Sequence, residues 1–254
     1  MKGRSRSYSI PTKRSNSKRP SQAAKKWTKS AVLQELKALA DPKVRVKMAD
    51  FGVNVRKAHG ISAPVLHTLA RHIGKDQELA EQLWASGIHE ARILATLIGE
   101  SDKVTEPQME RWARDFDSWD VVDAACCYLY AGAKPAWSKS YAWSKRPEEY
   151  VKRAAFSMAA YLSYKDKEAE DARFERFLWV IKREARDERN FVKKAVNWAL
   201  RNIGKRNLRL NRSAIQMAER IRQQDSRAAR WIAADALREL KSQAVQTRVR
   251  RKAV

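Results

Sequence analysis

The sequence contains few residues that break helices and almost no cysteine. Among its 254 residues are eight Gly, seven Pro and two Cys. Cys126 and Cys127 are adjacent, and adjacent positions on a helix are badly placed to form a disulfide with each other. No metal-ligand spacing surrounds them, the four histidines show none as a group, and no Gly-rich phosphate loop is present. We therefore expect a protein of the reducing cytoplasm, without a metal ion or a nucleotide cofactor.

Long apolar runs and strand-like alternation are also missing. No stretch approaches the roughly 18 uninterrupted apolar residues of a membrane span, so we expect no membrane partner. The N-terminus lacks the apolar core of a secretory signal. Ala, Leu, Arg, Lys and Glu dominate the composition, and 44% of the residues are apolar, which is enough for a substantial core. These features predict an all-α fold.

Acidic residues are absent from the first 29 positions, which hold ten Lys or Arg. Four more basic residues lie between positions 248 and 252, and subtracting these fourteen charges from the net +24 leaves about +10 for the rest of the chain. We divide the chain into a disordered basic arm (1–26), a folded domain (27–246) and a basic tail (247–254). The Arg- and Ser-rich arm also matches an organelle transit peptide. The charge predicts a polyanion partner, and together with the helical repeats below it favours nucleic acid.

Five stretches repeat one short pattern of small and apolar residues. They are residues 89–99, 119–130, 150–162, 191–204 and 228–240. When they are aligned, one slot in each stretch is occupied by a charged residue: Arg92, Asp123, Arg153, Lys194 and Arg230. The spacings of 31, 30, 41 and 36 residues between these slots are typical of two-helix solenoid units. We predict a HEAT-like helical-repeat solenoid in which the five matched helices line the concave side.

The slot holds a cation in four repeats and a carboxylate, Asp123, in one. Asp123 shares a helix face with Trp119, and Lys194 shares one with Trp198. The concave face is therefore predicted to be basic and to carry aromatic rings, which suits the phosphates, sugars and bases of a duplex. Two alternatives stay open: the slot cations could pair with acids of neighbouring repeats only to set the stacking, and Asp123 could neutralise a neighbouring Arg. The tryptophans that we assign to the hydrophobic core are Trp27, Trp84, Trp112, Trp143, Trp179 and Trp231.

The SWDVVD run at 118–123, followed by Arg153 and by the WALR run at 198–201, resembles the AlkD family of DNA alkylation repair proteins. The resemblance covers roughly residues 31–240. It implies HEAT-like repeats that wrap duplex DNA in a concave groove. It also implies a glycosylase that excises positively charged N3- and N7-alkylated purines without flipping the base into a deep pocket. Residues 56–61 depart from the family pattern because they lack its usual aromatic side chain.

The resemblance also implies roles for single residues. Asp123 matches the catalytic carboxylate, Trp119 and Trp198 match the aromatic pair at the deoxyribose of the lesion, and Arg153 matches the arginine that grips the DNA backbone. The full set of cations that we assign to DNA contact is Arg92, Arg153, Lys194, Arg201, Lys205, Arg206, Arg227 and Arg230.

The chemistry suits these residue types. An alkylated purine is already cationic and leaves readily, so cleavage of its N-glycosidic bond needs no strong general acid. A carboxylate beside the sugar stabilises the developing oxocarbenium charge and can orient the attacking water. We expect a monomeric, nucleoid-associated DNA glycosylase acting on double-stranded DNA with alkylated bases. The alternatives are a non-catalytic binder of distorted or branched DNA, and a protein-binding HEAT scaffold whose basic ends only localise it.

Overall fold

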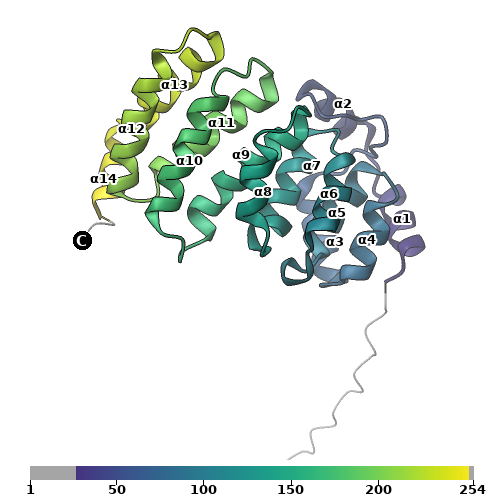
Figure 1. The fold of residues 1–254 in the computed structure, drawn as a ribbon. Helices are drawn as coiled ribbons and strands as arrows, with labels where there is room; N and C mark the ends of the chain where they lie inside the picture. The colour runs from purple at the N-terminus through teal and green to yellow at the C-terminus, as the bar shows by residue number, and fades with distance from the viewer. Residues whose placement is uncertain (1–26, 252–254) are drawn as a thin grey trace, which may run out of the picture.

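The structure is a computed structural model that describes residues 27–251 (Figure 1). This part of the chain is helical and contains no strand. Its α-helices are α1 (Lys29–Ala38), α2 (Pro42–Asp50), α3 (Ala63–Ile73), α4 (Gln77–Trp84), α5 (His89–Ile98), α6 (Glu106–Arg114), α7 (Trp119–Ala124), α8 (Ala136–Trp143), α9 (Glu149–Lys165), α10 (Asp171–Glu184), α11 (Asn190–Gly204), α12 (Leu208–Arg222), α13 (Arg227–Leu240) and α14 (Gln243–Arg251). Short 3₁₀ turns lie at Ser101–Lys103 and Tyr130–Gly132, and a π-helical turn lies at Ala125–Leu129.

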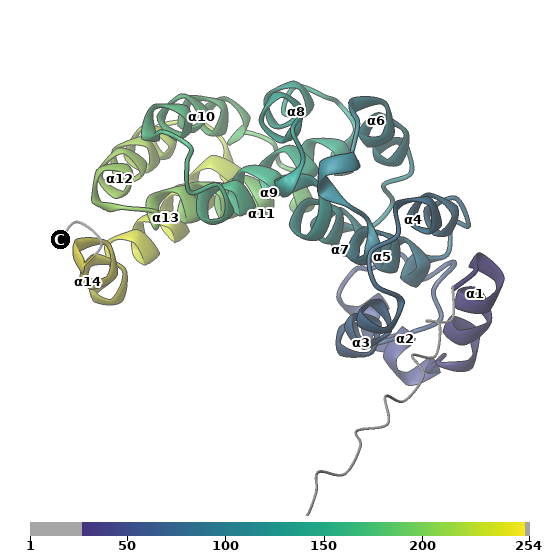
Figure 2. The same cartoon turned by 90° about the horizontal axis from the view of Figure 1, so that it is seen from below.

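The helices form an arc of two rows (Figure 2). The outer row contains α4, α6, α8, α10 and α12, and the inner row contains α5, α7, α9, α11 and α13. An inner helix packs against its outer partner and against the next inner helix, as α9 does against α8 and α11. The five matched stretches all lie in the inner row, so the predicted all-α solenoid, with these helices on the concave side, is confirmed.

The hydrophobic core runs between the two rows. As predicted, it takes in or packs against four of the assigned tryptophans, which are Trp27, Trp84, Trp112 and Trp143. The indoles of Trp84 and Trp112 stack with their centres 4.0 Å apart. The core prediction is wrong for Trp179 and Trp231, which are 53% and 42% exposed. A Lys ammonium lies 5.3 Å from the ring centre of Trp179 and another lies 5.6 Å from that of Trp231, so both rings face a cation at the surface.

Local signals in the sequence set the helix ends. Ser62 is the N-cap of α3, and Thr105 is the N-cap of α6, where its hydroxyl accepts from the backbone N–H of Gln108 at 3.3 Å. Before α3 the chain turns back onto the start of α2. Gly60 makes this return possible, because its φ is +84° and a Cβ there would lie 2.2 Å from the carbonyl oxygen of Asp41.

Helix α7 does not continue as a regular α-helix. At Ala125–Leu129 it widens into the π-helical turn, and a 3₁₀ turn follows. The single helix predicted over 119–130 therefore has three parts. Single π turns inside helices are rare and often occur beside functional positions. This one begins two residues after Asp123.

The C-terminal end of the folded part differs from the sequence prediction. Helix α14 runs to Arg251 and buries Val249, so the folded region continues past the predicted boundary at 246/247. The predicted basic arm, residues 1–26, and the last three residues lie outside the described part of the chain. Within residues 27–251, no helix is long and apolar enough to cross a membrane.

Candidate active site

Asp123 lies on α7 and its carboxylate faces Arg153 of α9. Arg153 Nε donates to one carboxylate oxygen at 3.1 Å, and Nη2 donates to the other at 2.7 Å. This two-pronged geometry makes a strong ion pair. Ser157, one turn further along α9, donates its hydroxyl to Asp123 Oδ1 at 2.8 Å. The inverted charge of Asp123 is thus neutralised by the slot cation of the next repeat, which is the alternative that the sequence left open.

The carboxylate of Asp123 remains reachable from one side. Burial raises the pKa of Asp123, and the charge of Arg153 with the hydroxyl of Ser157 opposes this rise without cancelling it. The side chain keeps 16% of its exposure. An ionised carboxylate offers about four lone-pair positions, and three of them are taken by Arg153 and Ser157. One position is left for a water molecule or a cationic group.

Asp123 forms part of the wall of a pocket of about 300 Å³. Helices α2, α3, α5, α7 and α9 contribute its other walls, and most of the lining is apolar. Besides Asp123, the residues of the lining that carry polar side-chain atoms are Ser62, His67, His89, Trp119, Asp120, Tyr128 and Tyr161. His67 and Tyr128 are joined by a hydrogen bond of 3.1 Å and meet edge to face. The pocket can therefore accept a mostly apolar or flat group while presenting a carboxylate to it.

The structure places the two predicted tryptophans differently with respect to this pocket. Trp119 lines it, and the guanidinium of Arg153 lies 5.7 Å from the centre of its ring. Trp198 of α11 does not line it. Its ring meets Tyr161 edge to face at 4.9 Å, and Tyr161 lines the pocket in its place. Asp123 and Trp119 are thus brought together, while Trp198 reaches the pocket only through Tyr161.

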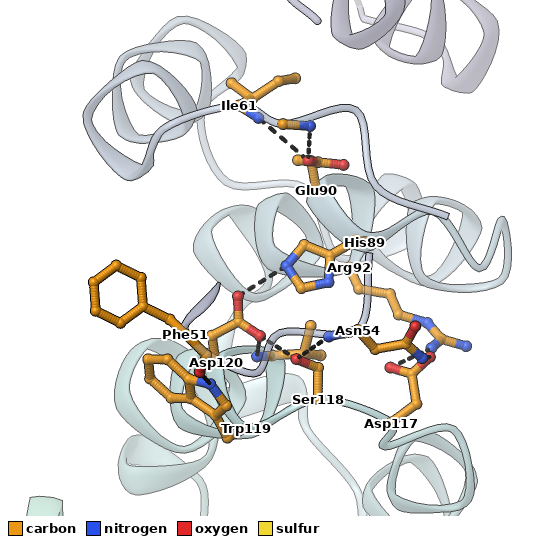
Figure 3. A network of polar contacts seen from close by, with 12 residues as sticks. Phe51, Asn54, Ile61, His89, Glu90, Arg92, Asp117, Ser118, Trp119 and Asp120 are labelled. Atoms are coloured by element: carbon orange, nitrogen blue, oxygen red, sulfur yellow. Dashed lines mark hydrogen bonds and ion pairs between the residues drawn. The ribbon is translucent and has the colours of Figure 1, made fainter. Parts of the chain in front are cut away.

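Residues 51–61, here called the cap segment, lie against the start of α7 beside the pocket (Figure 3), and Ile61 contributes to the pocket wall. The indole N–H of Trp119 donates to the carbonyl oxygen of Phe51 at 3.1 Å. The backbone N–H of Asn54 donates to the hydroxyl of Ser118 at 3.3 Å, and its side-chain amide donates to Asp117 at 3.0 Å. Segments far apart in the sequence are thereby joined at the N-terminal end of α7.

Glu90 of α5 holds the other end of the cap segment. Its carboxylate is buried and accepts the backbone N–H groups of His59, Gly60 and Ile61 at 2.9, 2.7 and 3.3 Å. Three such bonds compensate the loss of water around a buried charge. Glu90 therefore fixes the end of the loop that joins α2 to α3.

A buried His–Asp pair lies between these two anchors (Figure 3). His89 Nε2 lies 2.9 Å from Asp120 Oδ2, and the other oxygen of Asp120 accepts from Ser118 at 2.6 Å. Burial lowers the pKa of His89, but the hydrogen bond and charge of Asp120 outweigh it, so the pKa is raised. Burial alone would raise the pKa of Asp120, yet the hydrogen bond and charge of His89, together with the hydroxyl of Ser118, lower it. Both shifts favour the ionised pair.

Several cations predicted to contact DNA are engaged within the protein. Arg153 is 7% exposed and also donates to the carbonyl oxygen of Phe191. Arg92 donates to the carbonyl oxygen of Asp115, and Arg206 donates to carbonyl oxygens before α10. These contacts join neighbouring repeats, the stacking role weighed from the sequence.

The other predicted cations fall into two groups. Arg201 and Lys205 both pair with Glu239, at 2.5 and 2.6 Å. Lys194, Arg227 and Arg230 are exposed on inner helices, and Arg230 lies 3.3 Å from Asp225. Contact of any of these side chains with DNA stays a prediction.

Sequence reasoning missed most of the pocket wall. Ser157 and Tyr161 follow Arg153 at one- and two-turn spacings on α9, so the helical periodicity could have found them. Asp120 stands in the same SWDVVD run as Asp123 but was given no role. The cap segment carries no local signal of its position, because tertiary contacts with Trp119 and Glu90 place it.

Residues 32–248 match the model of a family described as DNA alkylation repair enzyme. The chain belongs to this family. A search of curated proteins finds no match in sequence. Among solved structures, the chain is similar to one described as "A new family of proteins related to the HEAT-like repeat DNA glycosylases with affinity for branched DNA structures". The two share 21% sequence identity with a TM-score of 0.69 over 82% of this chain and 94% of that one, which establishes the fold.

Membership in the DNA alkylation repair family agrees with the resemblance carried by the SWDVVD and WALR runs, since the matched region contains both. It covers the whole inner row and the cap segment. The similar solved structure supports the HEAT-like description of the solenoid.

Proposed function

We propose that this chain is a DNA repair glycosylase that hydrolyses the N-glycosidic bond of cationic N3- and N7-alkylated purines in duplex DNA. The observation that carries the proposal is the position of Asp123 on the inner row. Its partly accessible carboxylate shares a pocket wall with Trp119. The family to which the chain belongs is described as DNA alkylation repair enzyme. The pair of Asp123 and Trp119 suits that chemistry.

In the proposed reaction the bond between the sugar C1′ and the purine nitrogen breaks, and the bonding electrons leave with the purine. This neutralises the positive charge of the alkylated base, so no proton has to be supplied. The sugar becomes electron-poor, and the free lone pair of Asp123 stabilises it and orients a water molecule. The water oxygen forms a bond to C1′, and one of the two water protons passes to the solvent. Arg153 and Ser157 hold the carboxylate in place during this step. The lesion stays in the groove rather than entering a deep pocket.

The rings near the carboxylate support the same step. Trp119 lies at the pocket wall, and Tyr161 offers a second aromatic face there. An aromatic face attracts a cationic sugar by about 0.5–2 kcal/mol. In this proposal Tyr161 takes the place beside the sugar that the sequence assigned to Trp198, and Trp198 supports Tyr161 from α11.

The test is an Asp123→Asn variant, which keeps the shape of the side chain and removes its charge. We expect release of 7-methylguanine from methylated duplex DNA to fall on the order of 10²–10³-fold, because one electrostatic stabiliser of the transition state is lost. Affinity for the same DNA should change little. Asp102→Asn, at an exposed position outside the pocket, is the matched control and should keep full activity. Undiminished base release by Asp123→Asn would contradict the assigned role.

A second candidate is a non-catalytic protein that binds distorted or branched DNA. The ion pair between Asp123 and Arg153 favours it, because a neutralised carboxylate stabilises a cation less than a free one. The description of the similar solved structure names affinity for branched DNA structures. Wild-type protein that binds DNA junctions more tightly than linear duplex, and releases no alkylated base at any protein concentration, would decide for this candidate.

A further inference from the structure

Phe51, the C-cap residue of α2, presents an aromatic ring to solvent. It is 75% exposed, more than any other large apolar residue in the described part of the chain. A single exposed apolar residue needs no explanation by itself. Phe51 differs because its backbone is fixed and because it stands next to Trp119. Figure 3 shows the two rings on the same side of the polar network, away from Asn54 and Asp117.

The turn that carries Phe51 is held on three sides. The indole of Trp119 donates to the Phe51 carbonyl oxygen at 3.1 Å. The N–H of Gly52 donates to the carbonyl oxygen of Ala49 at 2.8 Å, which closes the end of α2. Gly52 has a φ of +74°, and a Cβ at this position would lie 3.3 Å from the ring of Phe191 on α11. The ring of Phe51 is therefore displayed from a rigid support that touches both α7 and α11.

The chain on both sides of Phe51 is basic. Residues 41–60 contain five Lys or Arg and two Asp. Lys43, Lys47 and Arg56 are exposed. Exposed cations in the chain on both sides of a flat apolar ring suit a strand of nucleic acid, with phosphates at the cations and a base against the ring. A purely apolar protein partner would gain nothing from this charge.

We propose that Phe51 is a wedge that stacks against a nucleobase where DNA is distorted or branched. Apolar side chains that enter a base step kink the duplex and partly unstack it. The cost of unstacking is least at a damaged, mismatched or unpaired position. A fixed wedge beside the pocket therefore selects DNA that is already weakened and brings the abnormal nucleotide to Trp119. This inference rests on the proposed binding of DNA but not on catalysis by Asp123.

The experiment uses the full chain and DNA that carries 2-aminopurine next to an unpaired site or at a three-way junction. Wild-type protein should raise the fluorescence of 2-aminopurine several-fold, because the probe loses its stacked neighbour. Phe51→Ala should abolish this rise and weaken binding to the branched DNA by about tenfold, the effect expected for one base–aromatic stack. Affinity for intact duplex should stay within about twofold of wild type.

Two controls separate a wedge from a structural role. Trp179→Ala removes another exposed ring, on the outer helix α10, and should leave the fluorescence response unchanged. Phe51→Trp should retain the response because it keeps a flat apolar ring. Thermal unfolding of Phe51→Ala should match that of wild type, since the carbonyl group rather than the ring makes the contact with Trp119.

The outcomes are distinguishable. If wild-type protein binds branched DNA and Phe51→Ala gives the same fluorescence rise and the same affinity, the wedge is overturned while DNA binding stands. If wild-type protein binds neither branched nor linear DNA, the proposed function fails together with the wedge. Loss of the fluorescence rise in Phe51→Ala and in Trp179→Ala alike would also contradict a specific role for Phe51.

Discussion

At the scale of single residues, the ion pair between Asp123 and Arg153 decides how the site works. The sequence assigned Asp123 to catalysis and Arg153 to the DNA backbone. The structure puts the two groups in one bidentate pair, with Ser157 as a third member. A guanidinium that is 7% exposed and donates three hydrogen bonds has little left to offer a phosphate. We therefore expect Arg153 to act on bound DNA only indirectly, by holding the carboxylate of Asp123.

Replacing Arg153 tests this interpretation. Arg153→Gln should lower the free energy of unfolding by about 3 kcal/mol, because removing one partner leaves the other charge buried and unpaired. The dependence of DNA affinity on salt should stay as in wild type, since no phosphate contact is lost. Chemical denaturation and binding titrations at several salt concentrations measure the two effects. A shallower salt dependence would show that Arg153 reaches the DNA after all.

A double variant supplies the control. Asp123→Asn combined with Arg153→Gln removes both charges, so part of the lost stability should return relative to Arg153→Gln alone. No recovery would mean that the destabilisation comes from the contact of Arg153 with Phe191.

The sequence predicted that Asp123 is a functional carboxylate, but not which residues it contacts. Asp123 stood out because its charge breaks the pattern of the slot, and its proximity to Trp119 follows from helical spacing. The partner of Asp123 depends on how α7 and α9 are rotated against each other, which no local pattern records. The same reason explains why Tyr161 rather than Trp198 lines the pocket.

At the scale of elements, the cap segment organises the N-terminal part of the site. Helix α2 has no buried residue, so its own packing cannot hold it in place. It is fixed instead by polar anchors at its two sides, Trp119 with Phe51 and Glu90 with the loop before α3. Asp41 and Pro42 are typical of a helix start, but nothing in the sequence shows that α2 contributes Val44 and Met48 to the pocket that Asp123 lines.

Removing the buried anchor should loosen this element. Glu90→Ala leaves the backbone N–H groups of residues 59–61 without an acceptor, and each such group costs about 1–3 kcal/mol if it stays buried. We expect a loss of about 3 kcal/mol in the free energy of unfolding, together with faster hydrogen exchange at 59–61. Glu78→Ala, at a helix position away from the cap, is the comparison. Exchange in Glu90→Ala as slow as in wild type would contradict the anchoring role.

At the scale of the whole molecule, curvature and charge act together. The inner row forms the concave side of the arc (Figure 2). The all-α class, the repeat units and the inner position of the matched helices were predictable, because helix pairs at this spacing can bury their apolar faces only by stacking. The distribution of charge was less predictable, since cations that join repeats and cations that face solvent look alike in sequence. Arg92 belongs to the first kind and Lys194 to the second.

The exposed inner cations should set the salt dependence of DNA binding. Lys194→Ala and Arg227→Ala are each expected to reduce the slope of log affinity against log salt by about 0.9, the value for one phosphate contact on duplex DNA. Arg92→Ala, whose guanidinium binds a carbonyl oxygen inside the protein, should leave the slope unchanged. Equal slopes for wild type and all three variants would place the DNA on another face of the arc.

In the proposed reaction the ionised carboxylate of Asp123 drives base release, and the pH dependence of single-turnover excision tests this role. The pKa of Asp123 is raised above its usual 3.8 by burial, so the rate should fall as the pH drops through a midpoint above that value. Asp120 does not confuse this limb, because its pKa is lowered and it stays ionised there. After spontaneous depurination is subtracted, we expect the rate of 7-methylguanine release to rise with pH to a plateau near neutrality. Release that is fastest at the acid end, or that shows no acid limb at all, would contradict it.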